Sequence, residues 1–384
     1  MRVCDVVINS IWHDPRVTKQ LKEYGKFAEV FAVGFKCDRY NADEIEKLIC
    51  PVELVSIDDK YYRKKRTIFT KIRRTILENY RIYRSIVKTK ADLIHANDLN
   101  ALIPSYFAAR KLKGKLVYDS HEIFVENNNL MRKPLAKKFY KRIEQYMAKR
   151  CDLMISVSNV AAEYFQKIYG IERPLVVTNC VSSDRIAMAE GVKKNEKFEV
   201  LNHGQFYPGR GYDVMAKAAP LLREYEDVEL VIRGYGKQER EIRDILEENG
   251  AKNFRIDGPV NVSELVSCAA KSMVGVAVTE GICVNFVYSV SNKIFEYAAA
   301  GLPVIMSDIP EHRYLNGKYN FGIILKENTP ECFAEAVGRL YNDKDFYESC
   351  AMGSRKLTEE LNWEREFEKL LDAERKLIEC KRKK

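Results

Sequence analysis

The sequence predicts an α/β protein made of two tandem domains, each built on a parallel sheet. Short apolar runs alternate with amphipathic segments along most of the 384 residues. This alternation is typical of parallel sheets with helices on both faces. A polar stretch at about 179–197 interrupts it once, and we interpret that stretch as a linker. The chain is also long enough for two domains, each with its own core.

The first half contains the apolar runs expected to form the first sheet. Amphipathic segments lie between several of them, and Asp14-Pro15 favours a helix start, because Asp caps free N–H groups and Pro suits the first helical position. The expected strands are Val3–Ile8, Val30–Val33, Val52–Ile57, Leu93–His95, Leu116–Tyr118, Leu153–Val157 and Leu175–Val177, with helices at Arg16–Tyr24, Leu99–Leu112 and Lys133–Ala148.

The second half repeats the alternation and ends in helices. The expected strands are Phe198–Leu201, Val228–Ile232, Phe254–Ile256, Val274–Val278, Val304–Met306 and Ile323–Leu325, with helices at Gly211–Glu224, Glu239–Glu248, Pro330–Tyr341, Phe346–Leu361 and Trp363–Cys380. In doubly wound sheets ligands bind beyond the carboxyl ends of the strands. With two facing domains, the cleft between them is the expected site.

The stretch from Ser291 to Ile305 carries the main functional signal. It reads as a polar loop, a short helix capped by Ser291 or Asn292, a stop at Gly301 and a buried strand. A helix N-terminus attracts phosphate, and Lys293 adds positive charge in the same turn. Glu296, one turn further on, is suited to accept hydrogen bonds from a vicinal diol such as a ribose. The pattern therefore favours a nucleotide, although an ordinary capped helix with a solvated Lys and Glu fits the same residues.

Two glycine-rich loops follow predicted strands at the same sheet edge. Gly204, Gly209 and Gly211 would let the backbone approach a ligand, and Arg210 could bind phosphate oxygens with its forked guanidinium. Gly234 ends the next strand. The spacing matches neither a Walker loop nor a dinucleotide fingerprint, and each loop taken singly could be an ordinary turn.

In the first half, Tyr118-Asp119-Ser120-His121-Glu122 directly follows a predicted strand. His121 would therefore face the site, where an imidazole can donate to a sugar hydroxyl or a phosphate. A satisfied loop histidine is the alternative. We find no Ser-His-Asp order with a nucleophile elbow in the sequence.

The net charge of +9 is unevenly distributed. The run Lys60–Lys90 has Glu78 as its only acid, the run Arg132–Arg150 has only Glu144, and the tail is Lys381-Arg382-Lys383-Lys384. Aromatic and aliphatic residues such as Tyr61, Tyr62 and Phe69 interleave the first run, which favours an anionic membrane surface over a merely solvated face. No nucleic-acid recognition motif accompanies these charges, so no nucleic-acid partner is expected.

Other features bear on the compartment and on cofactors. No segment approaches 18 uninterrupted apolar residues, and the N-terminus reads as a strand and not as a signal peptide. The ten cysteines form no CxxC pair, which favours reduced thiols and argues against a zinc site. We expect a cytoplasmic protein, peripheral at the inner face of the membrane, with no metal and no cofactor.

Taken together, these residues resemble the retaining glycosyltransferases of family 4, which have two facing Rossmann-like domains (the GT-B fold). The block Asn292–Ile305 is similar to that family's NKxFEYxAxGxPVI block, and it is the most specific part of the likeness. Asn9-Ser10 with His13-Asp14-Pro15-Arg16-Val17, and Tyr118–Glu122, are similar to its DPRV and YDxHE segments. The resemblance runs from residue 3 to about 365.

The resemblance implies a nucleotide-sugar donor, with UDP as the expected nucleotide, and a glycan or lipid-linked acceptor in cell-surface polysaccharide or glycoconjugate synthesis. By position, Glu296 would bind the ribose, Arg210 would stand where the family keeps a lysine on the diphosphate, and His121 would lie by the transferred sugar. His121 and Glu296 are the expected catalytic residues. The expected donor-binding residues are Gly204, Gln205, Arg210, Gly211, Gly234, Val260, Glu280, Ser291, Asn292, Lys293 and Glu296.

The chain departs from the family pattern at two positions. Gln205 replaces the usual arginine, and Tyr288 stands where the family's second glutamate is expected, so Glu280 is the candidate substitute. These departures keep two alternatives open: a nucleotide-sugar epimerase on the same fold, and a non-catalytic nucleotide-sugar-binding subunit. We expect an acceptor-side domain at 1–180, a donor domain at 181–362, and a last helix, 363–384, that crosses back onto the first domain.

Overall fold

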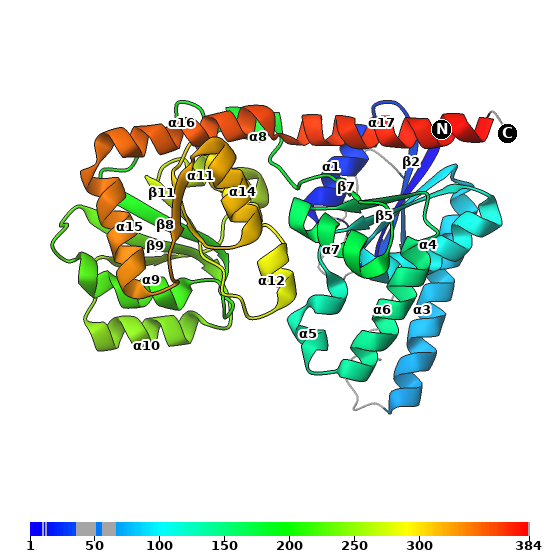
Figure 1. Ribbon diagram of the computed structural model, residues 1–384, viewed down its shortest axis with the longest axis horizontal. Coiled ribbons are helices and arrows are strands. Elements are labelled where there is room, and N and C mark those ends of the chain that lie inside the picture. Colours follow the sequence, from blue (N-terminus) through cyan, green and yellow to red (C-terminus); the bar gives the residue numbers. More distant parts are fainter. Residues whose placement is uncertain (10, 12–13, 36–50, 56–66, 383–384) are drawn as a thin grey trace. The chain divides into compact units, whose positions relative to one another are not determined.

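The computed structural model describes residues 1–9, 11, 14–35, 51–55 and 67–382, which form two compact units (Figure 1). Unit 1 comprises Met1–Val177 with Phe367–Lys384, and unit 2 comprises Thr178–Glu366. Ser10 and His13 of the DPRV-like opening, the first part of the Lys60–Lys90 run with Tyr61 and Tyr62, and Lys383-Lys384 of the tail lie outside the described residues.

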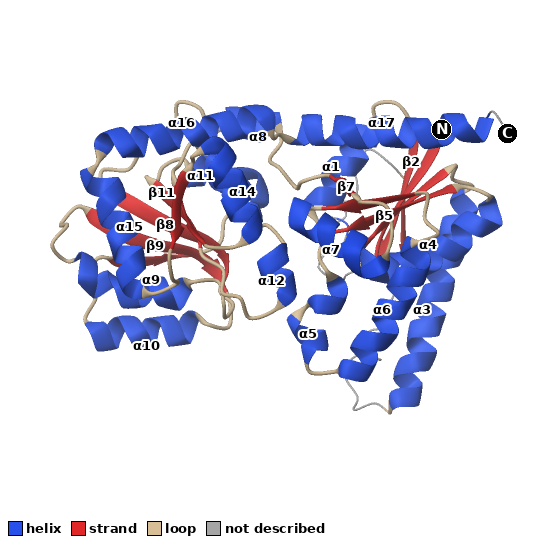
Figure 2. Ribbon diagram, in the orientation of Figure 1, coloured by secondary structure: helices blue, strands red, loops and turns tan. Residues whose placement is uncertain are grey.

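Unit 1 is built on a seven-stranded parallel sheet in the order β3-β2-β1-β4-β5-β6-β7. Helices cover both faces of the sheet, as Figure 2 shows. The strands are β1 (Arg2–Val7), β2 (Glu29–Phe35), β3 (Val52–Val55), β4 (Leu93–Asn97), β5 (Lys115–Ser120), β6 (Leu153–Ser156) and β7 (Leu175–Val176). The helices are α1 (Pro15–Tyr24), α3 (Ile68–Thr89), α4 (Asp98–Leu112), the short α5 (Asn128–Met131), α6 (Pro134–Ala148) and α7 (Asn159–Tyr169).

Unit 2 has a six-stranded parallel sheet in the order β10-β9-β8-β11-β12-β13. The strands are β8 (Phe198–Gln205), β9 (Val228–Tyr235), β10 (Phe254–Asp257), β11 (Val274–Ala277), β12 (Val304–Ser307) and β13 (Gly322–Leu325). The helices are α8 (Ser183–Ala187), α9 (Tyr212–Ala218), α10 (Glu239–Asn249), α11 (Leu265–Ala269), α12 (Val284–Tyr288), α13 (Asn292–Ala299), α14 (Pro310–Tyr319), α15 (Pro330–Asn342) and α16 (Lys344–Glu360).

The two-residue period of a strand places its side chains in two separate cores. Val200 of β8 packs in the core cluster that includes residues of α9 and α15, whereas the next residue, Leu201, packs in the cluster that includes residues of α13. Both side chains are fully buried. The uninterrupted apolar runs of the sequence therefore reflect strands covered on both faces, as predicted.

The last helix, α17 (Trp363–Arg382), begins in unit 2 and belongs to unit 1 from Phe367 onward. The backbone N–H of Trp363 donates to the carbonyl oxygen of Val181 over 3.0 Å. The Phe367 ring packs edge-on against Tyr24 at 5.0 Å, and the Tyr24 hydroxyl donates to Glu374 over 2.6 Å. The fold class, including a last helix that returns to the first domain, is confirmed.

Two predicted helix ends agree with the structure, and the stretch predicted as a linker contains a helix and buried residues. Asp14 caps α1 by accepting from Arg16 and Val17, and Gly301 follows α13 with a φ of +70°, as expected. The stretch predicted as a linker contains α8, and its residues Cys180 and Val181 are buried in the core of unit 2. The apolar residues within this mostly polar stretch explain why it packs. Within the described ranges, no helix is long and apolar enough to cross a membrane.

Candidate functional site

The carboxyl edge of the unit 2 sheet collects the predicted donor-binding residues. Gly204 and Gln205 end β8, Gly234 lies at the end of neighbouring β9, and Glu280 follows β11. The chain order of the strands reverses between β8 and β11, which is where doubly wound sheets bind ligands. The N-terminus of α13 reaches the same edge, because Lys293 contacts β8 there.

Glycine is required at this edge for close backbone packing. Gly204 and Gly234 are partners in the β8–β9 register and have φ angles of +127° and +149°. A Cβ on Gly234 would lie 1.8 Å from the carbonyl oxygen of Gly204. Gly211 starts α9 with a φ of +73°, and a Cβ there would lie 2.5 Å from the Cβ of Val278. The backbone of the loop after β8 therefore packs directly against the side chain of Val278 after β11, which leaves no room for a side chain at Gly211.

Lys293, the second residue of α13, is buried and points toward β8. Its Nζ donates to Oδ1 of Asn202 over 2.6 Å and to the hydroxyl of Tyr212 over 3.3 Å. Burial, together with the charge of Arg210, lowers the pKa of Lys293 to about 7. The sequence suggested a full charge here, but the amine carries only part of one at neutral pH, because both protein partners are neutral and burial penalises the cation.

Glu296 lies one turn beyond Lys293 and is held by a histidine that the sequence reasoning missed. Nε2 of His203 lies 2.8 Å from one carboxylate oxygen of Glu296. Burial lowers the pKa of His203. Burial opposes ionisation of Glu296 as well, but the hydrogen bond from His203 and the nearby charges of Arg185 and Lys293 lower the pKa of Glu296. We therefore assign a neutral His203 that donates from Nε2 to an ionised Glu296.

The carboxylate of Glu296 is positioned and still reachable. Its side chain is 19% exposed, and only the oxygen facing His203 has a partner in the described part of the chain. Glu296 is close enough to Lys293 for each charge to shift the other's pKa. It therefore does not point into an apolar interior, which would have excluded a role in ligand binding. The sequence offered one signal for His203, because this residue directly precedes Gly204 near the end of the same strand.

Arg210 and the N-cap of α13 add uncommitted polar groups. The Arg210 guanidinium stacks over the Phe286 ring at 4.8 Å, and burial lowers its pKa. Ser291 occupies the N-cap position of α13 but makes no capping hydrogen bond with its side chain, so the expected cap is absent. Asn292 is the first, exposed residue of that helix. The N–H of Ile294 donates to the carbonyl oxygen of Ser291 over 3.1 Å, so among the described residues the N–H groups of Asn292 and Lys293 are the ones at this helix end that can face an anion.

The remaining predicted donor residues lie around this centre. Gln205 donates from Nε2 to the hydroxyl of Tyr235 over 3.0 Å. The backbone N–H of Glu280 donates to the carbonyl oxygen of Gly209, and burial raises the pKa of the Glu280 carboxyl. Val260 is half-buried in the loop after β10. Gln205 and Glu280 keep contacts that position loops, and no direct contact joins them to Glu296 among the described residues.

In unit 1, His121 follows β5 and lies in a cluster of acids. Its Nε2 is 3.1 Å from Oδ1 of Asn97, its Nδ1 is 3.6 Å from Asp14, and its backbone N–H donates to Asp98 over 3.0 Å. Burial opposes a charge on His121, but Asp98, Asp119 and Asp14 raise its pKa to about 9. His121 is therefore a charged donor at neutral pH. Asp98 has a φ of +64°, a strained conformation often found at functional sites.

A buried polar network lies behind His121 and was not visible in the sequence. Arg16 forms a bidentate ion pair with Asp119, with N···O distances of 2.8 and 3.0 Å. His95 lies 3.2 Å from Asp119 on one side and 3.5 Å from Glu374 of α17 on the other. Burial opposes the charge on His95, yet Asp119 and Glu374 raise its pKa to about 10. Asp119 lies in β5 two residues before His121, and this proximity in sequence was the one available signal.

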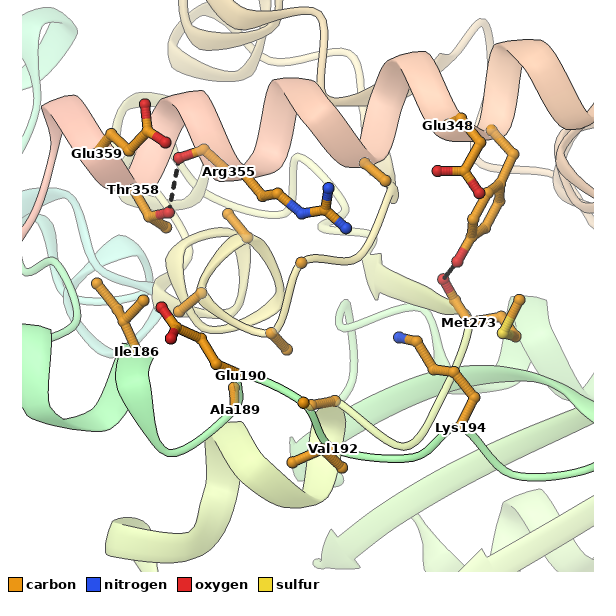
Figure 3. Close-up of a pocket in the computed structure, with 18 residues that line it drawn as sticks. Ile186, Ala189, Glu190, Val192, Lys194, Met273, Glu348, Arg355, Thr358 and Glu359 are labelled. Atoms are coloured by element: carbon orange, nitrogen blue, oxygen red, sulfur yellow. Dashed lines mark hydrogen bonds between the residues drawn. The ribbon is translucent and has the colours of Figure 1, made fainter.

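A separate cavity of about 520 Å³ lies at the other end of α13 (Figure 3). Lys194 and Arg355 point into it, and burial together with Arg355 lowers the pKa of Lys194 to about 8. Three acids, Glu190, Glu348 and Glu359, lie around the same cavity. Acids therefore balance the two cations. The first α13 residue that lines the cavity, Ala298, is six residues from Asn292, which is about 9 Å along the helix. It is not part of the site at the sheet edge.

The fold defines a two-domain α/β protein of the Rossmann-like class, with the N-terminus of α13 at the carboxyl edge of the unit 2 sheet. Comparison with known families is consistent with this class. A family model described as Glycosyltransferase Family 4 matches residues 19–185, and one described as Glycosyl transferases group 1 matches residues 197–343. The two models together span most of the chain, which therefore belongs to the family 4 glycosyltransferases, enzymes that use nucleotide-sugar donors and retain the anomeric configuration.

Solved structures share the whole fold at low identity. The Anabaena protein HepE in complex with UDP has a TM-score of 0.75 at 14% identity, covering 97% of this chain and 99% of that one. Sucrose-phosphate synthase from Thermosynechococcus elongatus has a TM-score of 0.76 at 14% identity, covering 99% and 100%. A putative UDP-N-acetylglucosamine 2-epimerase from Listeria monocytogenes reaches 0.64 at 13% identity, covering 98% and 96%. A search of curated proteins finds no match.

Proposed function

We propose that this protein transfers a sugar from a UDP-sugar to a glycan or lipid-linked acceptor with retention, in cell-surface polysaccharide or glycoconjugate synthesis. One observation carries the donor side. At the sheet edge, Lys293 lies close to both Arg210 and the positioned carboxylate of Glu296, and neither cation forms an ion pair in the described residues. Cations without protein counter-ions favour a diphosphate, and a reachable carboxylate favours a diol.

Each donor-side residue then has a defined task. Lys293, Arg210 and the free N–H groups of α13 bind the diphosphate, with Ser291 and Asn292 at the same helix end. Glu296 accepts hydrogen bonds from the ribose hydroxyls, and the backbone near Val260 meets the base. Gly204, Gly211 and Gly234 allow the backbone to approach the nucleotide closely. Gln205 and Glu280 hold the loops around the sugar.

The charge that develops on the leaving diphosphate sets the chemical requirement. Breaking the sugar–phosphate bond leaves negative charge on the nucleotide, and fixed positive groups stabilise it best when they are already oriented. Diphosphate binding would also favour the protonated form of Lys293, whose pKa of about 7 leaves it half-charged without a ligand. His121, held protonated by three acids, would donate to the transferred sugar.

The proposal of UDP as the nucleotide is supported by similar structures that contain UDP or a UDP-sugar. HepE of Anabaena has been solved with UDP and with UDP-glucose, and an Escherichia coli relative with UDP-2-fluoro glucose. We propose the same nucleotide for this chain. On the acceptor side, the basic and apolar helices of unit 1 support a lipid-linked acceptor at an anionic membrane surface.

A thermal-shift and calorimetry panel tests the donor proposal. UDP and UDP-sugars should raise the melting temperature of the full chain, whereas AMP or a free hexose should not, because only a bound ligand stabilises the folded state. Transfer is then measured with each stabilising sugar nucleotide and a lipid extract as acceptor. Stabilisation by no nucleoside diphosphate would refute the donor site.

The second candidate is a nucleotide-sugar epimerase, favoured by the fold shared with the Listeria protein. An epimerase consumes UDP-sugar without any acceptor and returns an isomeric sugar nucleotide. Product analysis without acceptor separates the two activities. A third possibility, a nucleotide-sugar-binding subunit without its own activity, would show the same thermal shifts but no turnover in either assay.

A further inference from the structure

Three helices of unit 1 line an open, apolar groove of about 940 Å³. Residues of α3, α4 and α6 line it, among them Ile76, Tyr80, Ile103, Phe107 and Phe139. Figure 1 shows α3 and α6 extending beyond the end of the unit 1 sheet. No charged side chain is among the residues that line the groove in the described part of the chain. Its volume lies near the upper end of the range of about 300–1,000 Å³ typical of ligand pockets.

The groove is open, and its apolar side chains are exposed to an unusual degree. Ile76, Phe107 and Phe139 are 62%, 55% and 61% exposed. Beside them, Phe69 of α3 and Leu135 of α6 are 79% and 84% exposed. Single exposed apolar residues are ordinary, but a contiguous set on neighbouring helices marks a surface that binds something apolar.

Positive charge borders the same helices. Lys138 and Arg142 of α6 are exposed, as are Arg132 and Lys133 just before it, and no ion pair involves any of the four among the described residues. The one acid of α6, Glu144, offers no compensation at the surface, since it is fully buried and accepts hydrogen bonds from Tyr118 and Tyr169. The exposed side of α6 therefore carries cations next to the apolar residues that line the groove.

This combination selects among occupants. An extended peptide in the groove would need partners for its backbone N–H and C=O groups. Apart from tyrosine hydroxyls, the described lining of the groove offers only Thr75 and Asn79. The Asn79 amide nitrogen already donates to the Thr75 carbonyl, and its Oδ1 is a single open acceptor, too few for an extended peptide. The hydrocarbon chain of a lipid needs no such partners, and an anionic lipid headgroup complements the exposed cations of α6.

We propose that the groove between α3, α4 and α6 receives one hydrocarbon chain of an anionic phospholipid, so that this face of unit 1 lies on the membrane. The inference rests on the proposed membrane association and is independent of the donor chemistry in unit 2. It gives the membrane contact a defined site: the chain lies among Ile76, Phe107 and Phe139, and the headgroup lies near Lys138 and Arg142.

Flotation of the full chain with vesicles tests the proposal. Vesicles of phosphatidylcholine alone are compared with vesicles containing phosphatidylglycerol, using wild type, Phe139→Ser and the double variant Lys138→Glu with Arg142→Glu. Phe139→Ser should weaken partitioning roughly tenfold or more, since a buried phenyl ring contributes that much. The charge variant should remove the preference for phosphatidylglycerol. Ile168→Ser, an exposed apolar position on α7 of the same unit, is the matched control and should partition like wild type.

A photoreactive group in the acyl chain then locates the contact. Cross-linked peptides should come from α3, α4 and α6. Equal flotation of Phe139→Ser and wild type, or cross-links confined to other elements, would overturn the groove while leaving membrane association intact. Wild type that floats with neither vesicle would overturn both. The thermal shift with UDP should be unchanged in every variant, which separates these outcomes from failure of the donor site.

Discussion

The role of Glu296 can be tested by changing the protein and the nucleotide together. Glu296→Gln is preferable to Glu296→Ala, because the amide oxygen can still accept from Nε2 of His203, which lies 2.8 Å away. Alanine would leave that buried N–H without a partner and cost about 1–3 kcal/mol of stability by itself. The glutamine variant removes the negative charge and keeps the shape of the site.

The expected size of the effect follows from hydrogen bonds to a charged acceptor. Such a bond contributes about 1.5–3 kcal/mol, so its loss should weaken UDP binding roughly 10- to 150-fold. With 2′,3′-dideoxy-UDP the diol is absent, and the same substitution should leave the affinity unchanged or slightly higher. It should be higher if anything, because Glu296 no longer places a negative charge near Lys293 and the diphosphate.

Isothermal titration calorimetry at fixed pH and salt measures all four dissociation constants. Glu331→Gln, at an exposed acid of the first turn of α15, is the control and should change none of them. An equal loss of affinity for UDP and for the dideoxy nucleotide would refute the reasoning, since the carboxylate would then act on the site as a whole and not on the ribose. Melting temperatures close to that of wild type show that the variant is folded.

Three further predictions follow from single residues. Because burial and Arg210 lower the pKa of Lys293 to about 7, UDP binding should take up a proton and weaken as the pH rises from 7 to 9, and calorimetry of Lys293→Met should show neither effect. The pKa of His121 is raised to about 9, above an unperturbed value near 6.5. The stability that its charge contributes is therefore fully present below pH 6.5 and is lost as the pH rises through 9. The free energies of unfolding of His121→Gln and wild type, measured with urea, should become equal toward pH 10. Gly234→Ala should destabilise by at least about 1–3 kcal/mol, since its Cβ would meet the Gly204 carbonyl at 1.8 Å and its φ is +149°, whereas Gly258→Ala, with no atom within 4 Å, should melt like wild type.

Sequence patterns predicted the strands well because their apolar runs are local. They failed where polar residues continue a strand. The prediction ends the first strand of the second domain at Leu201, but β8 continues to Gln205. Asn202 and His203 are buried there because Lys293 and Glu296, some 91 and 93 residues later, provide their partners. Periodicity cannot reveal such partners, because they exist only once the sheet and α13 have assembled.

The acids of unit 1 show the same limit of sequence patterns, because residues that read as solvated are buried in the fold. Glu144 reads as the one acid in a basic, solvated run, yet it is buried between Tyr118 and Tyr169, and burial raises its pKa to about 7. Arg16 and Asp119 are 103 residues apart in sequence and form the tightest buried ion pair of the unit 1 edge. Counting charges along the chain therefore located the basic surface but not the buried network.

The partners of each cation separate binding groups from structural ones. Arg16 is neutralised by a bidentate carboxylate, so its charge is committed to holding β5 against α1, and a ligand would have to compete with Asp119. Lys293 is held by an amide oxygen and a hydroxyl, and Arg210 by an aromatic ring, and within the described part of the chain neither cation forms an ion pair. A buried cation with only neutral partners is costly without a ligand, and the lowered pKa of Lys293 records that cost. A bound diphosphate would remove it, and this is the physical reason to place the donor at α13 and not at the equally buried charges of unit 1.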